Sequence, residues 1–365
     1  RNIVMANYSN DFSIENLEVI RRYQSNEDNV FFAYSEFSYN TLVGAYEPFL
    51  DIICNMHRRF IGGSFDDFQK ECGVYYLHRQ VLNSYYETGE CFREETVLLN
   101  EVAYEQRRMT MAIADMLKKL SEVKPLMIVI NRFQMASKSS IETIKYLIDN
   151  PCANIGIVLG VNAIVKGTDS TVEVWDRIVE SLEDRSAIYY IGSAGPLKNN
   201  VKTTNDDELY ITMNFEQSIQ EASNIMEFLD FEQARRGCRI IEHKLKFEDA
   251  WIDEKSLRRF YMVYARTSVL LGEMSKAIEL TNEYKALIPE NDSEHYLSLY
   301  YFMKGTCYMY QGKLEKAGNS AKSAYDYAVL AEDDTLIFKA ELLSVMIKMS
   351  GWYNIFFCVQ DIPVS

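Results

Sequence analysis

The chain has 365 residues and a formal net charge of −15, which argues against broad, non-specific contact with nucleic acid, because neutralising phosphates needs clustered lysine and arginine. Its 48% hydrophobic and 25% charged residues are typical of a soluble globular protein with two or three domains. No apolar run reaches the ~20 residues of a membrane span. The seven cysteines are scattered without a CxxC pair, so we expect a cytoplasmic protein without disulfides, a zinc site or membrane contact.

Strand-like and helix-like segments alternate over residues 1–200, which predicts an α/β domain with a parallel sheet wrapped by helices. The predicted strands are Asn2–Ala6, Asn29–Tyr34, 126–130, Asn154–Val161 and Ala187–Ile191. The predicted helices are Ser13–Tyr23, Thr41–Phe60, Glu101–Leu120, Ser139–Ile148 and Val172–Leu182. Residues 62–95 mix aromatic and charged side chains, and their pattern favours no element.

A polar stretch after Gly195-Pro196 predicts a linker over residues 201–215, and residues 216–365 are predicted to be all-α. This part carries a repeat in which glycine precedes alanine by five residues, as in Gly272 with Ala277, Gly312 with Ala317, a third copy starting at Gly351, and a weaker one at Ala234. The period (312 − 272 = 40) predicts stacked helical hairpins and resembles tetratricopeptide (TPR) repeats with lengthened helices. Because the last copy is cut short, we expect the chain to be a fragment of a larger protein.

The segment from Pro125 to Arg132 reads as a buried strand that ends in Asn131 and Arg132. In a nucleotide-hydrolysing α/β domain, the end of such a strand carries carboxylates that hold Mg²⁺ and orient water. An amide and a guanidinium stand at these positions, and neither is an anionic metal ligand. The chain therefore has the alternating strands and helices of an NTPase domain, but it lacks the carboxylates that would hold Mg²⁺ at this strand end.

The order of these features resembles the STAND class of signalling NTPases, in the branch that contains large LuxR-type bacterial transcription regulators. In the family's second motif, Gln134, Ala136 and Ser139/Ser140 match, while Asn131 and Arg132 replace two aspartates. The next strand commonly ends in an arginine that reads phosphates, and Asn162 stands there.

The phosphate loop of that class would span residues 6–13. Its glycines and lysine, which hold phosphates, are absent there, and only the hydroxyl residue matches, as Ser13. The resemblance thus implies a degenerate P-loop domain without catalytic residues, a metal site or an expected cofactor, although ATP or ADP stays open. Its vestigial nucleotide cleft would contain Ser13, Asn131, Arg132, Gln134 and Asn162.

Each of these residues also has a plainer interpretation. Ser13 is a suitable N-cap for the first helix, and Arg132 would by default pair with a nearby carboxylate. For Gln134, a structural hydrogen bond is favoured over a role in positioning a ligand or water. The 25 tyrosines and 19 phenylalanines, at helical spacing, are typical of core positions.

Three hypotheses remain. The leading one is a non-catalytic signal-sensing module of a larger regulator. In this hypothesis the helical repeats bind a protein or peptide, and a domain outside this chain binds DNA. The chain could also form homo-oligomers. The second is a nucleotide-binding switch that does not hydrolyse its ligand. The third is the sensor segment of an output enzyme such as a diguanylate cyclase or a kinase.

Overall fold

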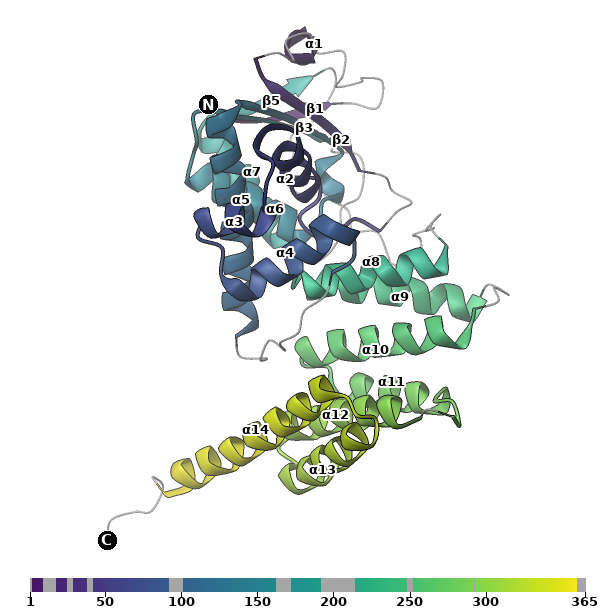
Figure 1. Ribbon diagram of the computed structural model, residues 1–365. Coiled ribbons are helices and arrows are strands. Elements are labelled where there is room, and N and C mark those ends of the chain that lie inside the picture. Colours follow the sequence, from purple (N-terminus) through teal and green to yellow (C-terminus); the bar gives the residue numbers. More distant parts are fainter. Residues whose placement is uncertain are drawn as a thin grey trace. The chain divides into compact units, whose positions relative to one another are not determined.

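The chain divides into two compact units, residues 1–247 and residues 248–365 (Figure 1). The computed structural model describes residues 2–8, 18–24, 29–37, 42–91, 101–161, 172–191, 214–247, 252–291 and 293–359. Within these ranges, no helix is long and apolar enough to cross a membrane. The predicted linker, residues 201–215, lies almost entirely outside them.

The first unit is built around a five-stranded parallel sheet with the strand order β2-β3-β4-β1-β5. Its strands are β1 (Ile3–Tyr8), β2 (Phe31–Glu36), β3 (Leu126–Asn131), β4 (Ile155–Val161) and β5 (Ile188–Ile191). All five predicted strands are confirmed, and so is the parallel α/β arrangement. All six residues of β3 are buried because the strand has neighbours on both edges and side chains above and below it.

Helices lie on both faces of this sheet (Figure 1). On one face, Ile20 of α1 (Glu18–Gln24) packs against Ala6, Met127 and Val158. The other face carries α2 (Phe49–Met56), α5 (Val102–Val123), α6 (Lys138–Asp149) and α7 (Val172–Asp184). Connections between parallel strands are right-handed, so the direction in which a connection moves along the sheet decides which face its helix covers. The β1–β2 connection moves in the opposite direction to the later connections, which places α1 on the opposite face from α2, α5, α6 and α7.

Two local predictions in this unit need correction. The helix predicted over Thr41–Phe60 begins at Phe49 instead, and a π-helical turn, His57–Ile61, continues it. Residues 45–48 form a turn in which Tyr46 has a left-handed φ of 57°, and Pro48 has no N–H to continue a helix.

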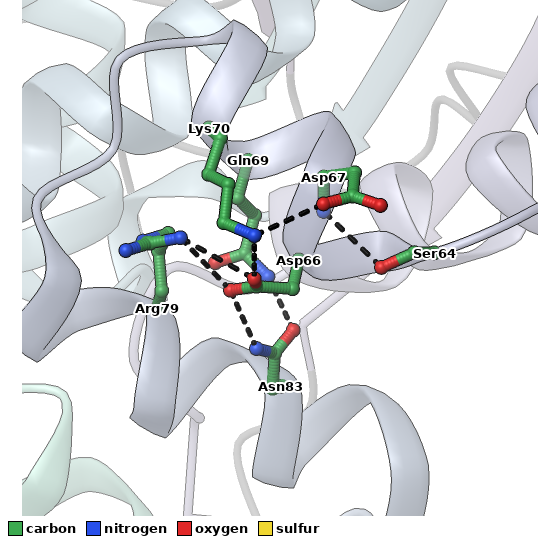
Figure 2. A network of polar contacts seen from close by, with 7 residues as sticks. All are labelled: Ser64, Asp66, Asp67, Gln69, Lys70, Arg79 and Asn83. Carbon is green, nitrogen blue, oxygen red and sulfur yellow. Dashed lines mark hydrogen bonds and ion pairs between the residues drawn. The ribbon is translucent and has the colours of Figure 1, made fainter.

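The segment with no assigned element contains α3 (Phe65–Glu71) and α4 (Tyr76–Thr88). Ser64 caps α3 by accepting a hydrogen bond from the Asp67 N–H. Polar side chains then join the two helices, as Figure 2 shows. Asp66 accepts from Lys70 at 2.7 Å, from Arg79 at 3.1 Å and from Asn83 at 3.2 Å. The Lys70 hydrogen bond is the largest influence that lowers the pKa of the Asp66 carboxyl.

Helical hairpins follow. The hairpin of α8 (Phe215–Glu227) and α9 (Phe231–Phe247) belongs to the first unit. The second unit contains α10 (Glu254–Leu270), α11 (Met274–Ala286), α12 (Ser293–Tyr310), α13 (Leu314–Leu330) and α14 (Asp334–Val359). The structure therefore confirms a helical part after the α/β part.

Four of these helices end in the same way. At the end of α12, the Gly312 N–H donates to the Met309 carbonyl and the Lys313 N–H to the Tyr308 carbonyl, both at 2.9 Å. This pair of bonds is a Schellman motif, which needs one residue in the left-handed conformation. The same bonds recur with positive φ at Gly272, Leu229 and Glu332, which end α10, α8 and α13.

Helices α10, α12 and α14 are in register at a spacing of 40 residues. Three sets of equivalent positions are buried in all three helices: Phe260, Tyr300 and Ala340; Val263, Met303 and Leu343; and Thr267, Cys307 and Ile347. The 40-residue period is thus a structural repeat. The copy predicted to start at Gly351 is wrong in one respect, because α14 continues through that glycine instead of turning there.

We predict opposite effects for two glycines of the second unit. Gly312→Ala should lower the free energy of unfolding by about 1 kcal/mol, because an alanine resists the left-handed conformation. No atom would meet the added Cβ at either Gly312 or Gly318. Gly318 lies inside α13 without a positive φ, so Gly318→Ala should raise stability by about 0.5–1 kcal/mol.

Urea unfolding of the full chain, followed by the helical signal at 222 nm, measures both effects. Glu332→Gly provides a third variant. It should raise the free energy of unfolding, because glycine adopts the left-handed conformation of this position without the strain of a side chain. Equal effects of alanine at Gly312 and Gly318 would contradict the assigned turn.

Candidate functional site

The carboxyl end of β3 carries a buried amide held from both sides. Asn131 is 7% exposed, and its Oδ1 accepts a hydrogen bond from the Tyr8 hydroxyl at 2.6 Å. The same oxygen accepts from the Arg132 backbone N–H at 2.9 Å, and Nδ2 donates to the Tyr34 hydroxyl at 3.3 Å. Three strands, β1, β2 and β3, thus contribute to one network around this amide.

Arg132 extends the network toward the surface. Its Nη2 lies 2.9 Å from Glu36 Oε1, its Nη1 donates to the Phe37 carbonyl at 3.4 Å, and its backbone is left-handed with φ of 55°. The Tyr34 hydroxyl donates to the other Glu36 oxygen at 3.1 Å. The guanidinium is therefore paired with a carboxylate, as the plainer interpretation predicted. About a third of each side chain is exposed, so solvent screens this ion pair.

The structure describes three of the five predicted cleft residues. Asn131 and Arg132 are adjacent in one network, while Gln134 lies in a 3₁₀ turn, Phe133–Met135, and is 2% exposed. Ser13 and Asn162 lie outside the described residues. Tyr8, Tyr34 and Glu36 were not singled out from the sequence, although carboxyl ends of parallel strands meet at one edge and could have indicated them.

A second polar centre lies at the N-terminus of α6. Ser137 is the N-cap, and its hydroxyl is 3.0 Å from the Ser139 hydroxyl and 2.9 Å from the Ser140 hydroxyl. Asp230, in the turn between α8 and α9, accepts from the Ser139 N–H at 3.0 Å and is 4% exposed. Burial raises the pKa of this carboxyl, and hydrogen bonds from Ser139 and Gln233 oppose the rise.

The same serines hold the turn before α2. The Ser140 hydroxyl donates to the Glu47 carbonyl at 2.7 Å, and the Tyr46 N–H donates to the Ser139 hydroxyl at 3.0 Å. From the hairpin, Gln233 Nε2 donates to the Val43 carbonyl at 3.0 Å. These bonds connect the α8–α9 hairpin to the first turn of α6 and to the segment before α2. We call this set of contacts the serine junction.

Beside the serine junction is a cavity of about 220 Å³ with an acidic lining. Glu47, Asp51 and Glu221 all contribute to it, together with Tyr85, whose hydroxyl donates to Asp51 at 3.2 Å. Glu47 Oε2 accepts from the Gly44 N–H at 2.9 Å. A Cβ added at Gly44 would lie 3.0 Å from Glu221 Oε1 and 3.4 Å from Glu47 Oε2, so the two carboxyl groups are close neighbours.

Their proximity and burial favour protonation. Burial, and then the charges of Glu47 and Asp51, raise the pKa of Glu221 to about 7. Burial, assisted by Asp51, also raises the pKa of Glu47, against the Gly44 hydrogen bond. Within the described ranges, no three His, Cys, Asp or Glu side chains are arranged to hold a metal ion.

Comparisons of the chain with family models, with curated proteins and with solved structures gave no match. The geometry of the first unit and the helical repeat are therefore the features that indicate a function. The network around Asn131 and the serine junction are the two features that bear on it most directly.

We predict that the Asp230 carboxylate holds the hairpin in place. Asp230→Ala would leave the buried Ser139 N–H without its acceptor, which should cost about 1–3 kcal/mol. Asp230→Asn keeps an oxygen of the same shape and should cost less. Hydrogen–deuterium exchange of peptides from residues 215–247 measures the loss of docking. Equal exchange in both variants and the wild type would contradict this role.

We predict that the first unit becomes less stable as pH rises from about 4.5 to about 7. Folding raises the pKa of Glu221 from 4.5 to about 7, so the folded state holds the proton more tightly. The resulting stabilisation is full below pH 4.5 and is lost as pH rises through 7.

Glu221→Gln cannot ionise, so it should flatten this pH dependence and stabilise the hairpin at pH 8. Glu216→Gln, at an exposed position of the same helix, is the matched control and should leave the slope unchanged. Urea unfolding at several pH values provides the measurement. A wild-type slope in the Glu221→Gln variant would refute the assignment.

Proposed function

We propose that the chain is a non-catalytic regulatory module. In this proposal the first unit is a degenerate STAND-type domain that responds to a signal through a change of conformation. The helical repeats, of TPR type, bind a protein or peptide. The parent protein is a bacterial regulator of the LuxR type that binds DNA through a domain outside this chain.

The network around Asn131 is the observation that carries this proposal. Phosphoryl transfer needs a carboxylate at the end of this strand to hold Mg²⁺ and an orienting group for water. Asn131 uses its amide for bonds to Tyr8, Arg132 and Tyr34. A magnesium ion at this place would meet the guanidinium of Arg132, and both charges are positive.

The serine junction supports the conformational part of the proposal. Ser139 and Asp230 join the first turn of α6 to the turn between α8 and α9 through a buried, directional hydrogen bond. Since only a short 3₁₀ turn separates β3 from α6, a shift at the end of β3 reaches the hairpin through few residues. Stacked helical hairpins in turn offer the extended surfaces that repeat proteins use to bind partners.

Nucleotide binding without hydrolysis is the competing function. It would require Arg132 to leave Glu36 and contact a phosphate, since the pair is 2.9 Å apart in this conformation. The third hypothesis, a sensor segment of an output enzyme, differs from the proposal only in the parent protein. Sequencing the rest of the gene decides that point.

We predict no heat of binding when ATP, ADP or GTP is titrated into the full chain, with or without Mg²⁺, at ligand concentrations up to about 1 mM. Nor should the protein hydrolyse them. Micromolar binding that Arg132→Ala abolishes would replace the proposal with the nucleotide switch. Arg185→Ala is the matched control, because Arg185 donates to the Ile148 carbonyl and precedes β5 at the amino edge of the sheet.

A further inference from the structure

Helices α10, α12 and α14 are equivalent in the repeat of the second unit, and they have one face in common. On α12 this face carries Leu299, Phe302, Thr306 and Tyr310. Their spacing of three, four and four residues places them on one side of the helix. All four residues are half-buried, so this side of α12 is in contact with solvent as well as with the protein.

The exposure of this face on α12 does not depend on a helix beyond α14. The helices that follow α12 cover a neighbouring side of it. A Cβ on Gly305 would lie 3.0 Å from Leu343 of α14 and 3.3 Å from Ser320 of α13. Leu299 and Thr306 stay half-buried with both of these helices in place. The face is therefore accessible in the middle of the repeat, where both neighbours are present.

The 40-residue register gives the equivalent positions on the other two helices. They are Arg259, Met262, Arg266 and Leu270 on α10, and Lys339, Leu342, Met346 and Ser350 on α14. Helix α12 contacts both α10 and α14, so the three faces adjoin. Phe302 and Tyr310 of α12 and Met346 of α14 pack against the same buried cluster. We call these positions on the three helices the shared face.

The shared face carries basic and apolar side chains but no acidic one. Its basic residues are Arg259, Arg266 and Lys339, and Arg259 is exposed. The second unit as a whole is acidic, because residues 248–365 contain 17 Asp or Glu and 12 Lys or Arg (12 − 17 = −5). A surface that is positive within an acidic unit is complementary to a negatively charged partner.

We propose that the shared face binds an acidic segment of another protein, with apolar side chains between its carboxylates. This inference rests on the proposed function, in which the helical repeats bind a protein or peptide, and it adds the chemistry of that partner. The three cations would pair with the carboxylates. Met262, Leu299 and Phe302 lie among them in the register and would contact the apolar side chains.

One row of the shared face indicates the spacing of charges in such a segment. Arg259, Leu299 and Lys339 occupy the same position on three successive helices. Packed helices are about 8–10 Å apart, so the two cations are separated by roughly 16–20 Å across the row. An extended chain advances about 3.3 Å per residue. Carboxylates about five or six residues apart would therefore reach both cations, with an apolar side chain over Leu299.

A nucleic acid fits this surface less well. It carries a negative charge on every nucleotide, so the acidic surroundings would repel it beyond the shared face. A short protein segment can confine its charges to the three cations. The apolar positions between them also match apolar side chains better than phosphates.

Selection of random 16-residue peptides by phage display on the full chain tests the proposal. The selected peptides should be enriched in pairs of Asp or Glu about five or six residues apart, with an apolar residue between them. Fluorescence anisotropy of labelled peptides then measures their dissociation constants, which we expect on the order of 1–100 µM, because the charge pairs are exposed to solvent.

Charge reversal locates the binding surface. Arg259→Glu with Arg266→Glu should raise the dissociation constant of a selected peptide about tenfold. Arg259→Glu alone, at an exposed position, should have a smaller effect in the same direction. Lys316→Glu with Lys322→Glu makes the same change of charge at exposed positions of α13 and should bind like the wild type. Circular dichroism checks that each variant folds.

The outcomes separate this inference from the proposed function. Selected peptides that are neutral or basic, but bind the helical repeats, would overturn the acidic partner and leave the regulatory module in place. The same holds if acidic peptides bind both double variants and the wild type equally. A labelled 20-nucleotide single strand that binds the shared face more tightly than every selected peptide would assign the face to nucleic acid. A selection that yields no peptide for the helical repeats would contradict both the inference and the peptide-binding part of the proposed function.

Discussion

The first unit depends on one buried carboxylate at the start of a helix. The backbone N–H groups in the first turn of a helix have no partner within it, and they carry a partial positive charge. In α6, Asp230 supplies the missing acceptor from a segment 91 residues away. Because the site is closed to water, the bond cannot be exchanged for a solvent contact. The hairpin of α8 and α9 is therefore fixed to the first turn of α6.

Two features of the first unit are close in sequence and in structure. Ser139 follows Asn131 by eight residues (139 − 131 = 8), and a buried 3₁₀ turn lies in the interval. Phe133 and Met135 are both at most 3% exposed, so the turn has little freedom to absorb a shift. A change in the network around Asn131 would thus alter the helix end to which Asp230 is bound. The proposed regulatory function requires such a connection between the strand end and the hairpin.

Much of the architecture could be predicted from the sequence, because apolar strands and helix periodicity are local signals. The run Leu126–Asn131 indicated a central strand, and the paired glycines at positions 272 and 312 indicated the repeat. The helix end at Leu229 escaped notice, because it takes the left-handed conformation without a glycine. The helix predicted over Thr41–Phe60 was wrong in its first part for a tertiary reason, since hydrogen bonds with α6 stabilise the turn at Tyr46 and Glu47.

The candidate site could be predicted only in part. Asn131 and Arg132 were visible as replacements at a strand end, but their partners come from segments 95 to 123 residues away. The acidic cavity has the same origin, since Glu47 and Glu221 meet only after the hairpin docks. A single sequence does not indicate which distant residues contact each other.

The left-handed backbone at Arg132 has a consequence for any attempt to install chemistry at this edge. The chain turns there as it leaves β3, and the backbone N–H of the same residue donates to the side chain of the preceding residue. An aspartate introduced at Asn131 would accept hydrogen bonds from the Tyr8 hydroxyl and the Arg132 backbone N–H, so these donors would already occupy one of its oxygens. Gain of metal-dependent turnover would need concerted replacement of several strand-end residues, whose effects would be strongly non-additive.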